Sequence, residues 1–191
     1  SDVYKRQMNN TTPLLAVAFV AFCLHSQARS APSSYAGQEQ RSIKALSPED
    51  VQALREGKGM GLAKAAELNG YPGPSHVLQH SDELSLSSQQ RQQTQALFQA
   101  MEVKAKPLGA ALVEAERELD LLFSSRLATP ELVQSQMLKI GNLQALVRAA
   151  HLEVHIAQAA LLTPEQIAQY NKLRGYTAQN ESGAHTPAHR H

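Results

Sequence analysis

The chain has 191 residues, of which 42% are hydrophobic and only nine are aromatic, five Tyr and four Phe. This length and composition suit one modest domain. Its formal net charge of +1 provides no overall field that would attract nucleic acid or an anionic membrane, so we expect no nucleic-acid partner.

The N-terminal residues have the features of an export signal. The apolar run from Pro13 to Leu24 is too short to span a membrane and is typical of a signal-peptide core. Small residues in Ser26-Gln27-Ala28 favour cleavage after Ala28, which predicts a signal peptide over residues 1–28, with Met8 as its start and residues 1–7 not native. Cleavage would remove Cys23, so we expect neither disulfides nor thiol chemistry in the exported chain.

Residues 29–74 are predicted to be a flexible leader followed by a linker. Residues 29–45 are polar and small, and Ser47-Pro48 then begins a short helix that reaches about Glu56. Gly and Pro punctuate residues 57–74, which predicts a linker with one or two helical turns. These glycines are not a phosphate-binding loop, because no strand precedes them and no Gly-Lys-Ser/Thr follows.

The rest of the chain is predicted to contain two long helices with short helices beside them. A short helix begins at Ser75, and Ser87 caps a long helix that runs to about Ser125, with Pro107 expected to kink it. Its apolar seam has nearly heptad spacing and consists of Leu97, Met101, Leu108, Leu112, Leu119 and Leu122. That seam must be buried, which requires a partner helix.

The second long helix is predicted from Thr129-Pro130 to about Leu161. Its matching stripe consists of Val133, Met137, Ile140, Leu143, Val147, Val154 and Leu161. The two stripes predict an antiparallel hairpin that turns near Ala128. A capping box at 163–166 begins a last helix to about Arg174, and residues 177–191 are expected to be disordered.

Two helix-starting motifs carry a resemblance to a known family. Leu162-Thr163-Pro164-Glu165-Gln166 and, less perfectly, Leu86-Ser87-Ser88-Gln89-Gln90 resemble the paired Leu-Thr-x-x-Gln motifs of the Spy/CpxP family. A degenerate third copy is Leu46-Ser47-Pro48-Glu49-Asp50, and the resemblance covers about residues 75–176. It implies an all-α, hook- or cradle-shaped homodimer in the periplasm. The implied activity is either ATP-independent holding of unfolded clients, or heavy-metal binding and envelope-stress sensing with a membrane-bound signalling partner.

Histidines spaced four apart predict a metal site. The pairs His76/His80 and His151/His155 would each lie on one helix face, where two imidazoles can share an ion. Imidazole suits zinc, nickel, cobalt and copper, so the metal is left open. Three further candidate ligands are Glu83, on the face of the first pair, and Met101 and Glu102, which the predicted turn places level with His155. The alternative for His151 is a hydrogen-bonded core histidine.

No enzyme motif is present in the sequence. His151-Leu152-Glu153-Val154-His155 is not the His-Glu-x-x-His motif of zinc proteases, and Glu153 would point away from the face of the two histidines. The tail histidines His185, His189 and His191 are expected to be part of a solvated segment. We therefore expect a non-enzymatic binding protein.

The chaperone hypothesis needs an amphipathic surface with a basic edge. Candidate edge residues are Arg91, Lys104, Lys106, Lys139 and Arg148. An ordinary solvated helix face is the alternative for each of them. A purely structural envelope protein, which needs neither ligands nor clients, is the third class of function.

Overall fold

The computed structural model describes residues 33–176, so the predicted signal peptide, Cys23 and the tail histidines lie outside the described residues. Contacts divide the chain between Ala36 and Gly37, and the described residues from Gly37 to Tyr176 belong to one compact unit. Its elements are a 3-10 turn, η1 (Gln38–Gln40), and six α-helices: α1 (Pro48–Arg55), α2 (Lys64–Glu67), α3 (Pro74–Gln79), α4 (Ser88–Ser124), α5 (Pro130–Leu161) and α6 (Pro164–Leu173).

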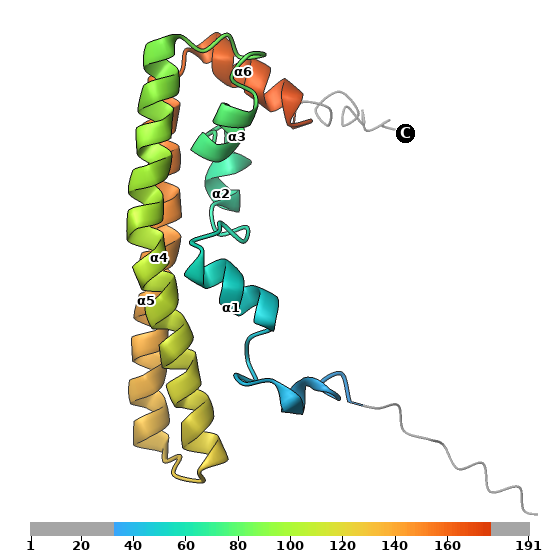
Figure 1. Cartoon of the computed structure of the whole chain (residues 1–191), viewed down its shortest axis with the longest axis vertical. Coiled ribbons are helices and arrows are strands. Elements are labelled where there is room, and N and C mark those ends of the chain that lie inside the picture. The colour runs from blue at the N-terminus through green and yellow to red at the C-terminus, as the bar shows by residue number, and fades with distance from the viewer. Residues whose placement is uncertain (1–32, 177–191) are drawn as a thin grey trace, which may run out of the picture. The chain divides into compact units, whose positions relative to one another are not determined.

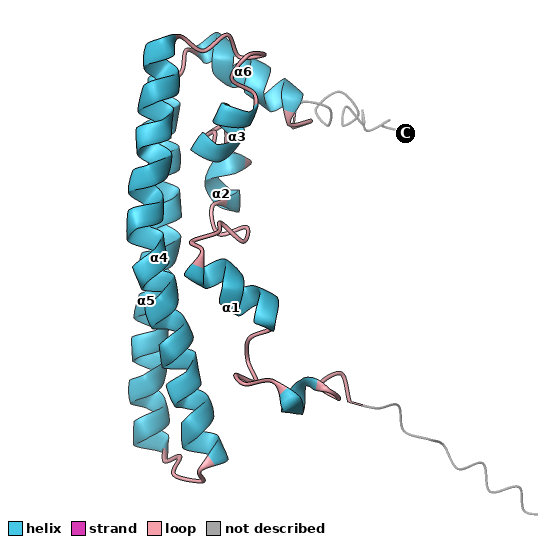
Figure 2. Cartoon of the chain, viewed as in Figure 1, coloured by secondary structure: helices cyan, strands magenta, loops and turns pink. Residues whose placement is uncertain are grey.

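Figure 2 shows helices and loops and no strand over residues 33–176. The expected all-helical class, with long helices and short flanking ones, is confirmed. No helix in this part of the chain is long and apolar enough to cross a membrane.

The two long helices lie side by side along most of their length (Figure 1). Polar contacts join Thr94 to Gln158, Lys104 to Glu153, and Glu118 to Lys139. Because the residue number falls along α5 as it rises along α4, the two helices run in opposite directions. Side-chain caps explain where they begin: Ser87 accepts a hydrogen bond from the Gln90 amide, and Thr129 accepts one from the Leu132 amide.

Proline inside α4 does not end the helix, which continues through Pro107 to Ser124. Pro107 is exposed, so water can hydrate the carbonyl that loses its hydrogen bond to the missing amide. Figure 1 shows α4 bending near its middle, the part of the helix that contains this proline. The bend agrees with the kink that the sequence predicts.

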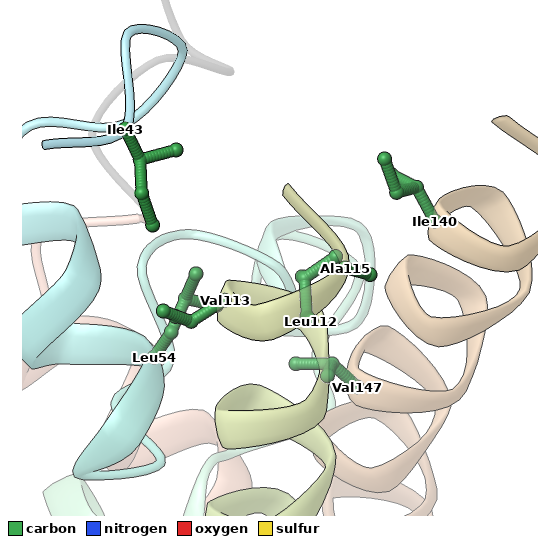
Figure 3. Close-up of a cluster of buried hydrophobic side chains, with 7 residues drawn as sticks. All are labelled: Ile43, Leu54, Leu112, Val113, Ala115, Ile140 and Val147. Carbon is green, nitrogen blue, oxygen red and sulfur yellow. The ribbon is translucent and has the colours of Figure 1, made fainter. Parts of the chain in front are cut away.

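The main core joins α1 to both long helices. Its buried side chains are Ile43, Leu54, Leu112, Val113, Ala115, Ile140 and Val147 (Figure 3). The sequence predicts a flexible leader over residues 29–45, but Ile43 is only 1% exposed. Asp120 in addition accepts hydrogen bonds from the backbone amide and the side chain of Lys44. The end of this leader is thus packed, because one large apolar side chain and one ion pair bind it to α4.

The Gly/Pro segment also departs from the expected linker. Pro72, Gly73 and Pro74 are buried, and α2 contacts α5 while α3 contacts α4 and α5. Glycine makes this close packing possible: a Cβ on Gly57 would lie 3.2 Å from the Cβ of Ala105 in α4. The segment therefore covers the long helices, and its glycines and prolines permit close approach.

The two Leu-Thr-x-x-Gln-like motifs meet in space. Each begins its helix with a capping box, and the Gln90 and Gln166 side chains donate amide hydrogen bonds to each other, with N–O distances of 2.8 and 3.2 Å. Gln90 also donates to the Leu161 carbonyl and Gln166 to the Leu84 carbonyl. A second core surrounds this junction, composed of Val77, Leu84, Leu86, Leu162 and Tyr170. The motifs therefore fasten α6 to the start of α4.

Candidate metal-binding pocket

One pocket of about 780 Å³ gathers most of the predicted metal-site residues. It lies among the loop after α1, the short helices α2 and α3, residues 98–106 of α4, residues 151–155 of α5, and the residues that follow α6. Its polar and sulfur-bearing lining includes Glu67, His76, Met101, Glu102, His151 and His155. Residues far apart in sequence therefore contribute nitrogen, oxygen and sulfur donors to one space.

His80 and Glu83 are not among the residues that line this pocket. His80 is the C-cap residue of the six-residue helix α3, so the first histidine pair does not sit inside a helix as the sequence predicts. The Nδ1 atom of His80 lies 3.8 Å from Glu83 Oε1. The helix α3 ends at Gln79, and residues 81–85 form a turn before α4 begins. His80 therefore stays next to His76 in the chain but does not line the pocket.

His155 is held by a backbone carbonyl in an orientation suited to a ligand. Its Nδ1 atom lies 2.7 Å from the carbonyl oxygen of Tyr71. A carbonyl can only accept, so Nδ1 carries the proton and the lone pair of the neutral ring is on Nε2. A Cβ on Gly73 would lie 2.9 Å from Nε2 and 3.6 Å from Glu67 Oε2. The absence of a side chain at Gly73 therefore leaves room beside both atoms.

His151 lies one turn before His155 on α5 and is only 5% exposed. Its Nε2 atom is buried and has no hydrogen-bond partner within residues 33–176. Burial lowers the pKa of His151 below the usual 6.5, and the positive charge of a protonated His155 would lower it further. The ring is therefore neutral at pH 7, which is the form that binds metals.

His76 approaches the same carboxylate from α3, with its Nδ1 atom 3.8 Å from Glu67 Oε1. Burial and then the charge of Arg174 lower the pKa of His76, and together they outweigh the opposing effect of Glu67. This imidazole too is neutral at pH 7.

Glu67 is the functional candidate that sequence reasoning missed. It is the last residue of α2 and only 9% exposed, and its two carboxylate oxygens have different surroundings. Oε1 accepts hydrogen bonds from Tyr170 and Tyr176, whereas Oε2 is buried and has no hydrogen-bond partner among the described residues. His155 Nδ1 lies 3.7 Å from this second oxygen. In the sequence Glu67 is one acid in a Gly/Pro-rich segment, and no spacing marks it.

Met101 and Glu102 occupy different positions in the pocket wall. Met101 is 8% exposed and packs with Ala105 and Val154 in a small apolar cluster. Glu102 is paired with Lys106, at 2.9 Å between Oε1 and Nζ. Met101 thus packs beside Val154, the residue that precedes His155 in α5.

Most of the five predicted client-binding cations lie next to a carboxylate. Four of them form ion pairs: Arg91 with Asp82, Lys104 with Glu153, Lys106 with Glu102, and Lys139 with Glu118. Arg148 lines a second, more open pocket of about 600 Å³ with Met60, Lys64 and Leu68. A nearby carboxylate therefore offsets the charge of four of these five cations.

Exposed apolar side chains gather where α4 and α5 are joined. Leu121 and Phe123 near the end of α4, Leu127 in the connection, and Leu132 and Leu138 in α5 are each between 46% and 71% exposed. Met137, which the sequence predicts on the buried stripe of α5, is 48% exposed. In Figure 1 the labelled short helices lie away from this end of the long pair, where these apolar side chains are exposed.

Comparisons of the chain with protein-family models, with curated proteins and with solved structures gave no significant match. Within residues 33–176, no three His, Cys, Asp or Glu side chains lie close enough together to hold a metal ion as they stand.

Proposed function

We propose that this chain is a non-enzymatic, exported protein that binds a divalent transition metal in the pocket of His76, His151 and His155. One observation carries the proposal. The pocket contains two buried polar atoms, His151 Nε2 and Glu67 Oε2, that have no hydrogen-bond partner in the described part of the chain. Leaving such atoms unsatisfied costs about 1–3 kcal/mol each, and coordination of an ion would offset this cost.

The donor set suits zinc, nickel, cobalt or copper. Neutral imidazoles, a carboxylate and the Met101 thioether are ligands of such metals. The hydrogen bond from His155 Nδ1 to the Tyr71 carbonyl is the outer contact that commonly fixes a ligating histidine. Because no three donors in residues 33–176 are close enough together as they stand, ion binding would require the other donors to move towards Nε2 of His155, whose ring the Tyr71 carbonyl holds. The space beside Gly73 leaves room for that movement.

The resemblance to the Spy/CpxP family supports the cellular part of the proposal. We place the protein in the periplasm, as an antiparallel hairpin in a hook- or cradle-shaped homodimer that senses heavy metals under envelope stress. The paired capping boxes and the reciprocal hydrogen bonds of Gln90 and Gln166 support this resemblance. A membrane-bound signalling partner would read out the metal-bound state.

Calorimetric titration with Zn²⁺, Ni²⁺, Co²⁺ and Cu²⁺ tests the proposal. The parent should be the full chain with His185, His189 and His191 replaced by Ala, so that the tail does not contribute. His151→Ala with His155→Ala should weaken binding by at least about 100-fold and leave the helical circular dichroism signal intact. Gly73→Ala should also weaken binding, because its Cβ would fill the space beside His155 Nε2.

His80→Ala is the matched control, because it removes an imidazole that faces Glu83 outside the pocket. The metal affinity of His80→Ala should equal that of the parent, whereas the metal affinity of His76→Ala should be lower. If the double variant keeps its metal affinity and loses only thermal stability, His151 and His155 are core residues and the metal site is wrong.

Holding of unfolded clients is the second candidate function, and the exposed apolar side chains near the connection of α4 and α5 favour it. Contiguous apolar surface often marks an interaction site. The full chain should then suppress aggregation of an unrelated unfolding protein without ATP, and Phe123→Ser with Leu138→Ser should reduce the effect. No suppression at several-fold excess, with or without metal, would contradict this function.

A further inference from the structure

Three side chains from the C-terminal end of the described chain hold Glu67 by one oxygen. Tyr170 donates to Oε1 at 2.5 Å and Tyr176 donates to it at 3.1 Å, and Arg174 Nε lies 3.4 Å from the same atom. All three are within seven residues of one another in α6 and the turn after it. The opposite oxygen, Oε2, faces His155 and has no hydrogen-bond partner among residues 33–176.

Tyr170 is a neutral and rigid donor. It is 0% exposed and packs in the core of Val77, Leu84, Leu86 and Leu162. Burial and the hydrogen bond to Glu67 raise the pKa of Tyr170 far above its ordinary value, so its hydroxyl stays protonated. A donor fixed in this way sets the rotation of the Glu67 carboxylate, because Oε2 must point away from the oxygen that Tyr170 binds.

Arg174 is a charged partner of Glu67 and is less buried than Tyr170. It is the C-cap residue of α6, and its side chain is 28% exposed. Its Nε also donates to the Tyr176 hydroxyl at 3.3 Å, and its guanidinium lies 5.8 Å from the centre of the Tyr176 ring. Arg174 thus provides the positive charge that a buried carboxylate needs in the absence of an ion.

A divalent cation bound at Oε2 would also bring positive charge to the Glu67 carboxylate. The charge of Arg174 would repel this cation, whereas the neutral tyrosine hydroxyls would not. We propose that Tyr170 and Arg174 tune the metal affinity of Glu67 in opposite directions: Tyr170 positions the carboxylate for the ion, and Arg174 competes with the ion for its charge. This inference rests on the metal site proposed above. It makes α6 part of the site, although α6 contributes no ligand.

Zn²⁺ titration of three single variants tests the opposite signs, in the full chain with the three tail histidines replaced. Tyr170→Phe should lower the affinity about 10–100-fold, as loss of an outer hydrogen bond to a ligand commonly does. Arg174→Gln should raise it about tenfold or more, because a like charge is removed. Lys172→Gln removes the same charge from an exposed position on the same helix, and the affinity should stay within about twofold of the parent.

Thermal melts without metal separate tuning from a structural role. Tyr170→Phe and Arg174→Gln should both lower the melting temperature, because each removes a partner of buried Glu67. A purely structural role would move stability and affinity in the same direction for both variants, and that outcome would overturn the inference. Equal effects of Arg174→Gln and Lys172→Gln would overturn the competition by Arg174. A parent that binds no Zn²⁺ would overturn the metal site together with this inference, whereas binding without opposite signs overturns the inference alone.

Discussion

Gly109 lies inside α4 at the point where α1 crosses it. A Cβ built there would lie 2.0 Å from the Leu54 carbonyl oxygen, whereas ordinary van der Waals contact begins near 3.4 Å. The Gly109→Ala variant therefore lacks about 1.4 Å of space by subtraction of these two distances. The clash is with backbone, so a side-chain rotation cannot relieve it and α1 must move.

The expected cost of this substitution combines two opposing effects. Displacing α1 disturbs the packing of Leu54, which is 7% exposed, against Val113, which is fully buried. Overpacking of this kind costs about 1–3 kcal/mol, and more for backbone contacts. Alanine in a helix interior is favoured over glycine by about 1 kcal/mol. We expect a net loss of about 1–2 kcal/mol in the free energy of unfolding, or about 2–8 °C in melting temperature for a chain of this size.

Gly141→Ala is the matched control for this prediction. Gly141 lies inside α5, and a Cβ there would meet nothing within 4 Å. The same substitution should therefore stabilise the protein by up to about 1 kcal/mol. Thermal and urea denaturation followed by circular dichroism measure both variants. If Gly109→Ala were as stable as Gly141→Ala, α1 would not pack against α4 at this point.

Two further predictions concern the motif junction and the buried histidines. Gln166→Ala removes the partner of the Thr163 cap and the hydrogen bonds to Gln90 and the Leu84 carbonyl. It should lower the free energy of unfolding, measured by urea denaturation, by about 1–2 kcal/mol. An equal loss for the exposed Gln89→Ala variant would contradict this prediction. For the metal-free protein, unfolding should become easier as the pH falls below about 6.5, because the lowered pKa values of His76 and His151 mean that the unfolded chain takes up protons first. Above this pH the contribution of the two neutral histidines to the free energy of unfolding is fully present. The slope between about pH 6.5 and 5 should be smaller for the His76→Gln, His151→Gln double variant, and an unchanged slope would show that these histidines are not its cause.

Much of the candidate site could be placed from the sequence. The spacing of His151 and His155 predicts that both lie on one face of one helix. Met101 and His155 are equally many residues from the predicted turn near Ala128, so the sequence predicts that they lie at the same level of the two long helices. His76 is on the correct short helix. The sequence also groups His80 with His76, but His80 is the C-cap residue of α3 and does not line the pocket.

Glu67 could not be found from its sequence neighbours. Its importance comes from partners that are 103 and 109 residues away, Tyr170 and Tyr176. The sequence predicts a linker for the Gly/Pro segment around it, since glycine and proline disfavour regular structure. In the folded chain the same residues allow a close approach, as Gly73 does beside His155.

The sequence by itself determined the helices, because helix boundaries depend on local chemistry. Ser47, Ser87, Thr129 and Thr163 accept hydrogen bonds from backbone amides within three residues, and each begins a helix where predicted. Only the tertiary structure decided which polar atoms lose contact with water. Burial at Glu67 and His151 depends on how α2 and α3 pack on the long helices and on how Tyr170 of α6 packs with Val77 of α3. No local pattern encodes that packing.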